Sequence, residues 1–116
     1  MPYTPPAHLP RCGVVDLGSN SVRLVVFEGH GRNPIGIFNE KAVLRLGRGL
    51  SATGLLNDEG MAQAFTVLHR YHAVARAMGA TPFEVLATAA VRDAHNGPDF
   101  VAALNTRLPG VPIRVL

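Results

Sequence analysis

The sequence is poor in the residues on which disulfides and membrane spans depend. It contains one cysteine, Cys12, and no tryptophan. A single cysteine cannot form an intrachain disulfide, so Cys12 is expected to be a small core residue in a cytoplasmic protein. No run of about 18 apolar residues occurs, so no membrane span is expected. The N-terminus has no basic leader followed by an apolar stretch, so no secretory signal is expected either.

Charge is also scarce. Only 16% of the 116 residues are charged, whereas 47% are hydrophobic, which predicts one globular domain or a part of one. The net charge is +3, and ten of the eleven basic residues are arginine, a side chain that binds phosphate oxygens bidentately. The arginines are scattered, with no basic run of five or more. A polyanionic small or polymeric substrate therefore fits at least as well as nucleic acid, which is not the expected partner.

The chain divides into a short leader and one domain. Four of the first ten residues are proline, which excludes a helix or a central strand there. Residues 1–10 are therefore predicted to be a flexible, Pro-rich leader. Residues 11–116 are predicted to form the N-terminal portion of a domain that is truncated at its C-terminus.

Apolar runs and turn residues predict an α/β fold with a mixed sheet in the order βββαβαβ. Strands are expected over residues 11–16, 22–28, 35–46 (bent near Asn39), 83–88 and 111–116, and helices over 58–78 and 97–108. Asn57 is the expected N-cap of the first helix, and Gly79 is the residue expected to end it. The fourth strand follows a helix, so it should pair in parallel with the first strand through a right-handed crossover. Residues 47–54 are predicted to be a loop.

The turn between the first two strands, Gly18–Ser21, carries anion-binding chemistry. Gly18 permits a positive φ and a close ligand approach, and successive N–H groups in such a turn can form an anion-binding nest. Ser19, Asn20 and Ser21 add side-chain donors. Asp16 precedes the turn at the end of a strand that looks buried, where a carboxylate is costly without a partner. A metal ion beside a phosphate would be such a partner. An ordinary hairpin turn is the alternative interpretation.

A second polar segment, Thr88–Asn96, follows the fourth strand. Ligands in open α/β sheets bind at the carboxyl ends of the strands, so Thr88 and Arg92 can reach a ligand held by the first turn. The alternative for Arg92 is an ion pair with Asp93. The roles of three other arginines stay open. Arg45 and Arg48 are either exposed charges or a wall of the anion site, and Arg23 has no assigned role.

Together these two segments resemble one family. Asp16–Val26, Asp-Leu-Gly-Ser-Asn-Ser-Val-Arg-Leu-Val-Val, resembles the first phosphate loop of the exopolyphosphatase / guanosine pentaphosphate phosphohydrolase family, within the actin–sugar kinase–heat-shock ATPase superfamily. Thr88–Asn96 fits the family's Thr-x-Ala-x-Arg-x-Ala-x-Asn pattern. The resemblance covers residues 12–116, the first part of the family's N-terminal domain. It implies a ribonuclease H-like, actin-like fold with strand order 3-2-1-4-5.

The resemblance also implies a reaction, the removal of terminal phosphate from inorganic polyphosphate or guanosine pentaphosphate with the help of Mg²⁺. Asp16 would hold the metal. The implied phosphate contacts come from Gly18, Ser19, Asn20, Ser21, Thr88 and Arg92. In the family, the general-base glutamate and a second Asp-x-Gly-Gly-Gly loop come later in the sequence, beyond Leu116. The chain alone is therefore expected to be weak or inert, and the full-length protein is expected to be a homodimer.

Three other functions are considered. A sugar or acetate kinase of the same superfamily would have a Gly-Gly-Thr or Gly-Thr-Thr turn, and this chain has Ser-Asn-Ser instead. A non-catalytic sensor that binds polyphosphate or an alarmone is compatible with all of these residues. Nucleotide-dependent filament formation would be indicated by polymerisation on addition of ATP.

Overall fold

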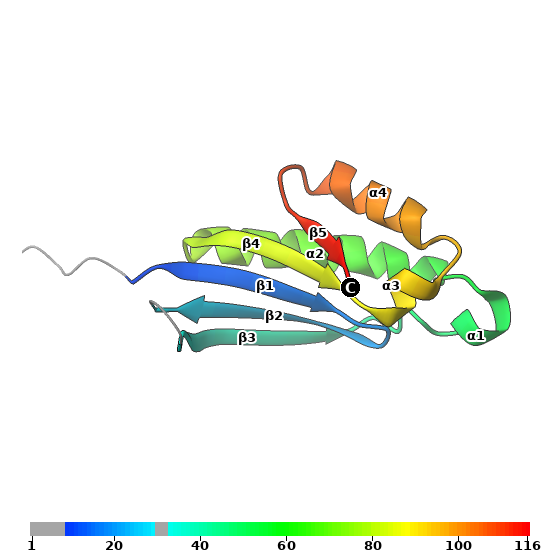
Figure 1. Cartoon of the computed structure of the whole chain (residues 1–116), viewed down its shortest axis with the longest axis horizontal. Helices are drawn as coiled ribbons and strands as arrows, with labels where there is room; N and C mark the ends of the chain where they lie inside the picture. The colour runs from blue at the N-terminus through cyan, green and yellow to red at the C-terminus, as the bar shows by residue number, and fades with distance from the viewer. Residues whose placement is uncertain (1–8, 30–32) are drawn as a thin grey trace, which may run out of the picture.

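The computed structural model of the chain describes residues 9–29 and 33–116. The predicted leader lies outside the described residues except for its last two positions. The described part forms five strands and four helices (Figure 1). The strands are β1 (Arg11–Leu17), β2 (Ser21–Glu28), β3 (Ile35–Val43), β4 (Ala80–Ala87) and β5 (Ile113–Val115), and the helices are α1 (Leu50–Thr53), α2 (Asp58–Ala77), α3 (Ala89–Asp93) and α4 (Gly97–Arg107).

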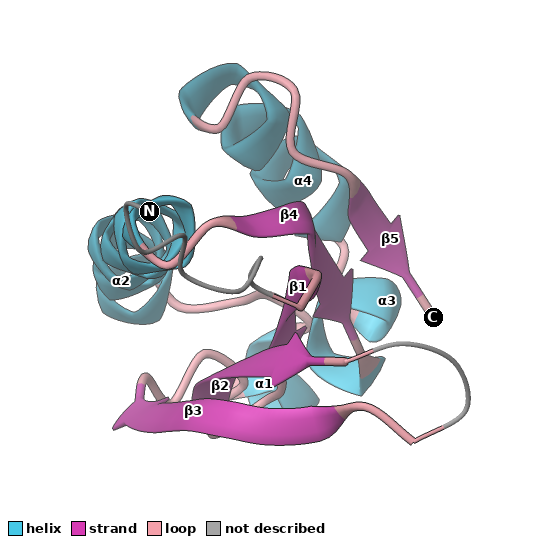
Figure 2. Cartoon of the chain, turned by 90° about the vertical axis from the view of Figure 1, so that its left-hand side faces the viewer, coloured by secondary structure: helices cyan, strands magenta, loops and turns pink. Residues whose placement is uncertain are grey.

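All five strands belong to one mixed sheet with the order β3-β2-β1-β4-β5, which confirms the predicted α/β topology. The first three strands are antiparallel, and β4 and β5 run parallel to β1. Helices α2 and α4 cover one face of this sheet, and Figure 2 shows this layering end-on. The two helices meet at Phe65 and Phe100, whose ring centroids are 5.5 Å apart. Among the described helices, none is long and apolar enough to cross a membrane.

The core lies between the sheet and α2 because alternate residues of the central strands point to the helix side. Strand residues that are fully buried there are Val15, Leu17, Val22, Leu24, Val26, Val85 and Ala87. From α2, the fully buried residues are Ala64, Leu68, Tyr71 and Ala75, at helical spacing. Cys12 lies in β1 but is only half-buried, so the expectation that it is a core residue is wrong.

Helix α2 begins and ends as the sequence predicts. The side chain of Asn57 accepts a hydrogen bond from the Gly60 N–H at 2.7 Å, which satisfies one of the first-turn donors. After the helix, Gly79 has a φ of +69°, the left-handed conformation that glycine adopts without strain.

Two strand boundaries differ from the prediction by three residues, and the fifth strand is shorter than the predicted 111–116, at Ile113–Val115. The third strand ends at Val43, because the N–H groups of Leu44 and Arg45 both donate to the Asn20 carbonyl at 2.9 Å instead of extending the ladder. The fourth strand begins at Ala80, three residues early, although it contains Pro82. Pro82 falls where the β1–β4 register shifts, and an irregularity of the ladder is a place that accommodates a residue without an N–H.

The connections contain two helices that the sequence does not predict. Part of the expected 47–54 loop forms α1, and Thr88–Asn96 begins with α3. The turn between α3 and α4 is tight. Gly97 donates its N–H to the Ala94 carbonyl at 3.1 Å, and a Cβ at Gly97 would lie 2.0 Å from the Val91 carbonyl oxygen. This turn therefore requires glycine.

The stability of the chain is expected to fall in mild acid because of His72. The His72 ring stacks on Phe83 with centroids 5.0 Å apart. Burial lowers the pKa of His72 below its usual value, and the neighbouring Arg76 and His69 lower it further. The unfolded chain therefore takes up this proton at higher pH than the folded chain does. Stability should decrease as the pH falls below about 6.5, until the lower folded-state pKa is passed.

Urea unfolding at pH 7.5 and pH 5.5 measures this effect. The His72→Phe variant should lose part of the difference between the two pH values while keeping an aromatic ring against Phe83. The control is His69→Gln on the same helix, which should keep most of the difference. An unchanged pH dependence in His72→Phe would contradict the assignment.

Candidate functional site

Three segments meet at the carboxyl ends of β1 and β4. The first is the turn Gly18–Ser21, the second is the connection from β3 to α2, and the third begins at Thr88 after β4. The Gly47 N–H donates to the Ser19 carbonyl at 2.7 Å, which joins the first two segments. The Thr88 N–H donates to the carbonyl of Leu17, the last residue of β1, at 3.2 Å, which places the third segment beside the start of the first. The fold therefore brings together two motifs that are about 70 residues apart in the sequence.

These segments border an open cavity of about 480 Å³. The first turn contributes Ser19 to its wall, and the segment after β4 contributes Ala89, Ala90 and Asp93. The β3–α2 connection supplies Gly47, Leu50, Ser51 and Gly54. The wall therefore consists mainly of small side chains, which leave the main chain accessible to a ligand.

Four main-chain donors at or next to this cavity have no acceptor in the described part of the chain. The N–H groups of Ser19 and Asn20, both exposed residues, donate to no acceptor among residues 9–29 and 33–116. The same holds for the N–H groups of Ala89 and Ala90. The carbonyls of Ser19 and Asn20, in contrast, accept hydrogen bonds from the β3–α2 connection. The turn therefore exposes the N–H groups of Ser19 and Asn20 while the carbonyls of these two residues are occupied, a polarity that suits an anion.

Thr88 and Arg92 are both engaged with protein groups. The Thr88 hydroxyl donates to the Leu17 carbonyl at 3.3 Å. Arg92 is exposed and pairs with Asp93, with 3.0 Å between Nε and Oδ1. Its Nη1 donates to the Leu116 carbonyl at 3.2 Å. The alternative that the sequence left open for Arg92, an ion pair with Asp93, is thus the arrangement in this structure, and Asp93 rather than Arg92 lines the cavity. The hydrogen bond to Asp93 also raises the pKa of Arg92.

Asp16 is exposed, so the expectation of a buried carboxylate is wrong. The strand alternates, and only one face of the sheet is covered by α2 and α4. Asp16 lies on the other face, opposite Arg23 of β2 in the antiparallel register. Arg23 donates to the Asn39 side chain at 2.6 Å, and within the described part of the chain Asp16 has no hydrogen-bond or ion-pair partner. A single free carboxylate completed by water and substrate phosphate is a common way of holding Mg²⁺, so the donor set fits this ion.

Arg45 and Arg48 border a different cavity. It has a volume of about 300 Å³ and is also lined by Asn57, Glu59 and Gln63. The connection after β3 separates it from the cavity at Ser19. The two arginines are thus close to the first turn in the chain path without lining its cavity.

Sequence reasoning assigned no role to Asn96, the last residue of the second motif. Its side-chain oxygen accepts from the Leu56 N–H at 2.8 Å, and its NH₂ group donates to the Leu56 carbonyl at 3.1 Å. The neighbouring His95 N–H donates to the Gly54 carbonyl at 2.8 Å. These bonds join the segment after β4 to the β3–α2 connection, and both segments contribute residues to the cavity at Ser19. The signal that could have drawn attention to Asn96 is its place in the motif.

Comparison with known proteins identifies the family. Residues 14–116 match the Ppx/GppA phosphatase family, which is most of the chain. The chain belongs to this family. Exopolyphosphatase 1 of Mycobacterium tuberculosis is 32% identical over 107 residues, which cover 91% of the chain and 31% of that protein. Exopolyphosphatase 2 of the same organism is 32% identical over 116 aligned residues, which cover 93% of the chain and 36% of that protein.

Solved Ppx/GppA structures share the fold. A Ppx/GppA family member from Aquifex aeolicus superimposes with a TM-score of 0.85 at 25% identity, over 93% of this chain and 35% of that one. The ethanolamine utilization protein EutJ from Carboxydothermus hydrogenoformans has the same general fold, with a TM-score of 0.52 at 20% identity. The chain spans about a third of the length of the Ppx/GppA relatives it matches.

Proposed function

We propose that this chain supplies the first phosphate-binding part of a phosphoanhydride hydrolase, which removes terminal phosphate from inorganic polyphosphate or guanosine pentaphosphate. The observation that carries the proposal is the set of unpartnered N–H groups at Ser19 and Asn20, beside the cavity that the second motif also lines. Homology to exopolyphosphatases supports the substrate class.

The chain's own residues would bind and orient the phosphate. Phosphoryl transfer depends mainly on positioning and on neutralising charge. The N–H groups of the turn, with the side chains of Ser19, Asn20 and Ser21, would hold phosphoryl oxygens, and Gly18 would let the ligand approach the main chain. Arg92 would join them only after it leaves Asp93. Thr88 would do so only by turning its hydroxyl proton away from the Leu17 carbonyl.

Asp16 is the proposed ligand for Mg²⁺. When bound, the ion neutralises phosphate charge and orients water. The general base is expected in the sequence that follows residue 116 in the family, so the chain alone should bind phosphate but turn over weakly or not at all. Homodimerisation of the full-length protein stays a prediction.

Replacing Asn20 by aspartate should weaken binding of tripolyphosphate at least tenfold. The substitution keeps the shape of the side chain and places a carboxylate in the anion-binding turn, where like charges repel. The matched control is Asn105→Asp on the exposed side of α4, which changes the net charge equally and should change affinity less than twofold. Calorimetry measures the affinity of both variants for tripolyphosphate. If Asn20→Asp and the unmodified chain bind tripolyphosphate with equal affinity, the turn is not part of the binding site.

Phosphate release from long-chain polyphosphate with Mg²⁺ tests the second half of the proposal. The chain alone should release no more phosphate than Asn20→Asp does. A chimera in which the chain replaces the aligned part of Exopolyphosphatase 1 from M. tuberculosis should regain release. Binding without release in both forms would favour a sensor. Transfer of phosphate from ATP to a sugar or acetate would favour a kinase. Release by the chain alone that Asn20→Asp abolishes would mean that it contains its own base.

A further inference from the structure

Arg45 and Arg48 differ from most arginines of the described chain in having no partner there. Four of the others contact carboxylates, one contacts an amide and one stacks on an aromatic ring: Arg11 on Glu28, Arg70 on Glu40, Arg92 on Asp93, Arg114 on Glu84, Arg23 on Asn39 and Arg107 on Phe65. Arg76, near the end of α2, also lacks a partner among the described residues, but it stands alone. Among the arginines that the structure describes, Arg45 and Arg48 border the same cavity.

The backbone at Arg45 is unusual. Its φ is +53°, the one positive φ at a non-glycine residue in the described part of the chain. This conformation costs about 1–2 kcal/mol relative to glycine. Three hydrogen bonds maintain it. The Arg45 N–H donates to the Asn20 carbonyl, and the Arg45 carbonyl accepts from the Arg48 N–H at 3.0 Å and from the Asn57 side chain at 2.7 Å. Glycine would fit here more easily, so the guanidinium group is the feature that needs an explanation.

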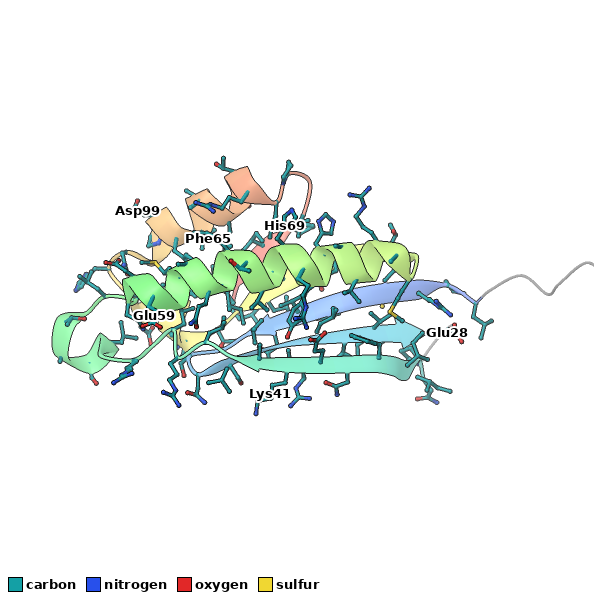
Figure 3. The ribbon with its side chains drawn as sticks, turned by 180° about the vertical axis from the view of Figure 1, so that it is seen from behind. Glu28, Lys41, Glu59, Phe65, His69 and Asp99 are labelled. Carbon is teal, nitrogen blue, oxygen red and sulfur yellow. The ribbon has the colours of Figure 1, made fainter. Side chains whose placement is uncertain are left out.

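The cavity that these two side chains border has the size and charge for a phosphate group. Its volume is about 300 Å³, and its polar lining comes from Arg45, Arg48, Asn57, Glu59 and Gln63. Figure 3 shows Glu59 in the first turn of α2, at this end of the molecule. Glu59 makes no ion pair with either arginine. Two cations and one carboxylate leave the lining with an excess of positive charge.

This cavity lies next to the first turn. The same main-chain segment borders both cavities, because Gly47 lines the one at Ser19 and Arg45 and Arg48 line the other. The segment is fixed to the turn by its hydrogen bonds to the Ser19 and Asn20 carbonyls. A linear phosphate chain that is held at one end by the turn would cross this segment to reach the two guanidinium groups.

We propose that Arg45 and Arg48 form a second anion subsite, which binds a phosphoryl group further along the chain whose terminal phosphate the turn holds. This inference rests on the proposed function of the turn. Guanidinium groups bind phosphate oxygens bidentately, so a pair of them suits one internal phosphoryl group. The subsite would make affinity depend on the length of the phosphate chain.

The test compares orthophosphate, which occupies the turn alone, with tripolyphosphate, which can reach both sites. The double variant Arg45→Gly with Arg48→Gln should bind tripolyphosphate at least tenfold more weakly and orthophosphate within twofold of the unmodified chain. Arg45→Gly also relieves the positive φ, so the melting temperature should not fall. Arg76→Gln is the control for removal of one exposed, unpartnered positive charge. It should weaken the binding of tripolyphosphate less than twofold.

Each outcome decides between the two proposals. Unchanged tripolyphosphate affinity in the double variant overturns the subsite, and the turn survives if Asn20→Asp still loses binding. Equal losses for orthophosphate and tripolyphosphate would also overturn it, since the arginines would then act on the turn itself. No binding of either ligand by the unmodified chain overturns both proposals. If Arg45→Gly disturbs folding, Arg48→Gln alone must still lose affinity for tripolyphosphate selectively. If Arg48→Gln shows no such selective loss, the subsite is rejected.

Discussion

Gly97→Ala is expected to lower the free energy of unfolding by about 3 kcal/mol, the upper end of the usual cost of overpacking. The added Cβ would lie 2.0 Å from the Val91 carbonyl oxygen, and this oxygen belongs to the main chain, so no side-chain rotation relieves the overlap. Either α3 or the start of α4 must move. Urea denaturation followed by circular dichroism measures the loss.

Gly110→Ala is the matched control for this prediction. Gly110 has a φ of +79°, and its Cβ would meet no atom within 4 Å. That substitution therefore reports the conformational cost of a positive φ alone, about 1–2 kcal/mol. Gly97 has no positive φ, so its cost is steric. If Gly97→Ala lowers the free energy of unfolding less than Gly110→Ala does, the α3–α4 turn adjusts to the added Cβ at little cost.

Asn96→Ala should destabilise the chain by about 2–3 kcal/mol, because it leaves the N–H and the carbonyl of Leu56 without partners in a half-buried place. The same variant should weaken orthophosphate binding, since Asn96 joins two walls of the cavity beside Ser19. Thermal unfolding with and without phosphate measures both effects.

The control for Asn96 is Asn105→Ala, an exposed position in α4 whose side chain has no hydrogen bond to the described residues. It should change the free energy of unfolding by less than about 0.5 kcal/mol. Asn96→Asp provides the readout that separates positioning from general stability. It keeps an acceptor for the Leu56 N–H and loses the donor for the Leu56 carbonyl, so it should recover part of the stability. If Asn96→Ala binds phosphate as tightly as Asn105→Ala, Asn96 has no positioning role.

Sequence patterns were sufficient where a signal repeats along the chain. The apolar stripe of α2, with Asn57 before it and Gly79 after it, defined a helix of 20 residues to within one residue at its end. The strand order followed from crossover rules together with the family resemblance. Helices α1 and α3 were missed because four or five residues show no periodicity.

The site was predictable only in part. The turn Gly18–Ser21 and the second motif could be found from residue types, and the topology brings them together. The exposure of Asp16 could not be predicted, because alternation in a strand does not reveal whether the second face of the sheet is covered. The contacts of Asn96 were also out of reach, since Leu56 lies 40 residues away and the contact depends on the tertiary fold.

The hydrogen bonds to the turn carbonyls also bear on how metal and phosphate would be held. The main-chain carbonyl oxygen of Asn20 accepts two hydrogen bonds, which occupy its two lone pairs. The main-chain carbonyl oxygen of Ser19 accepts one. The Ser19 and Asn20 carbonyls are thus largely engaged, whereas the N–H groups of the same two residues donate to no acceptor among the described residues. A phosphate chain would therefore find main-chain donors in the turn, whereas a magnesium ion would depend on the Asp16 side chain proposed above as its ligand.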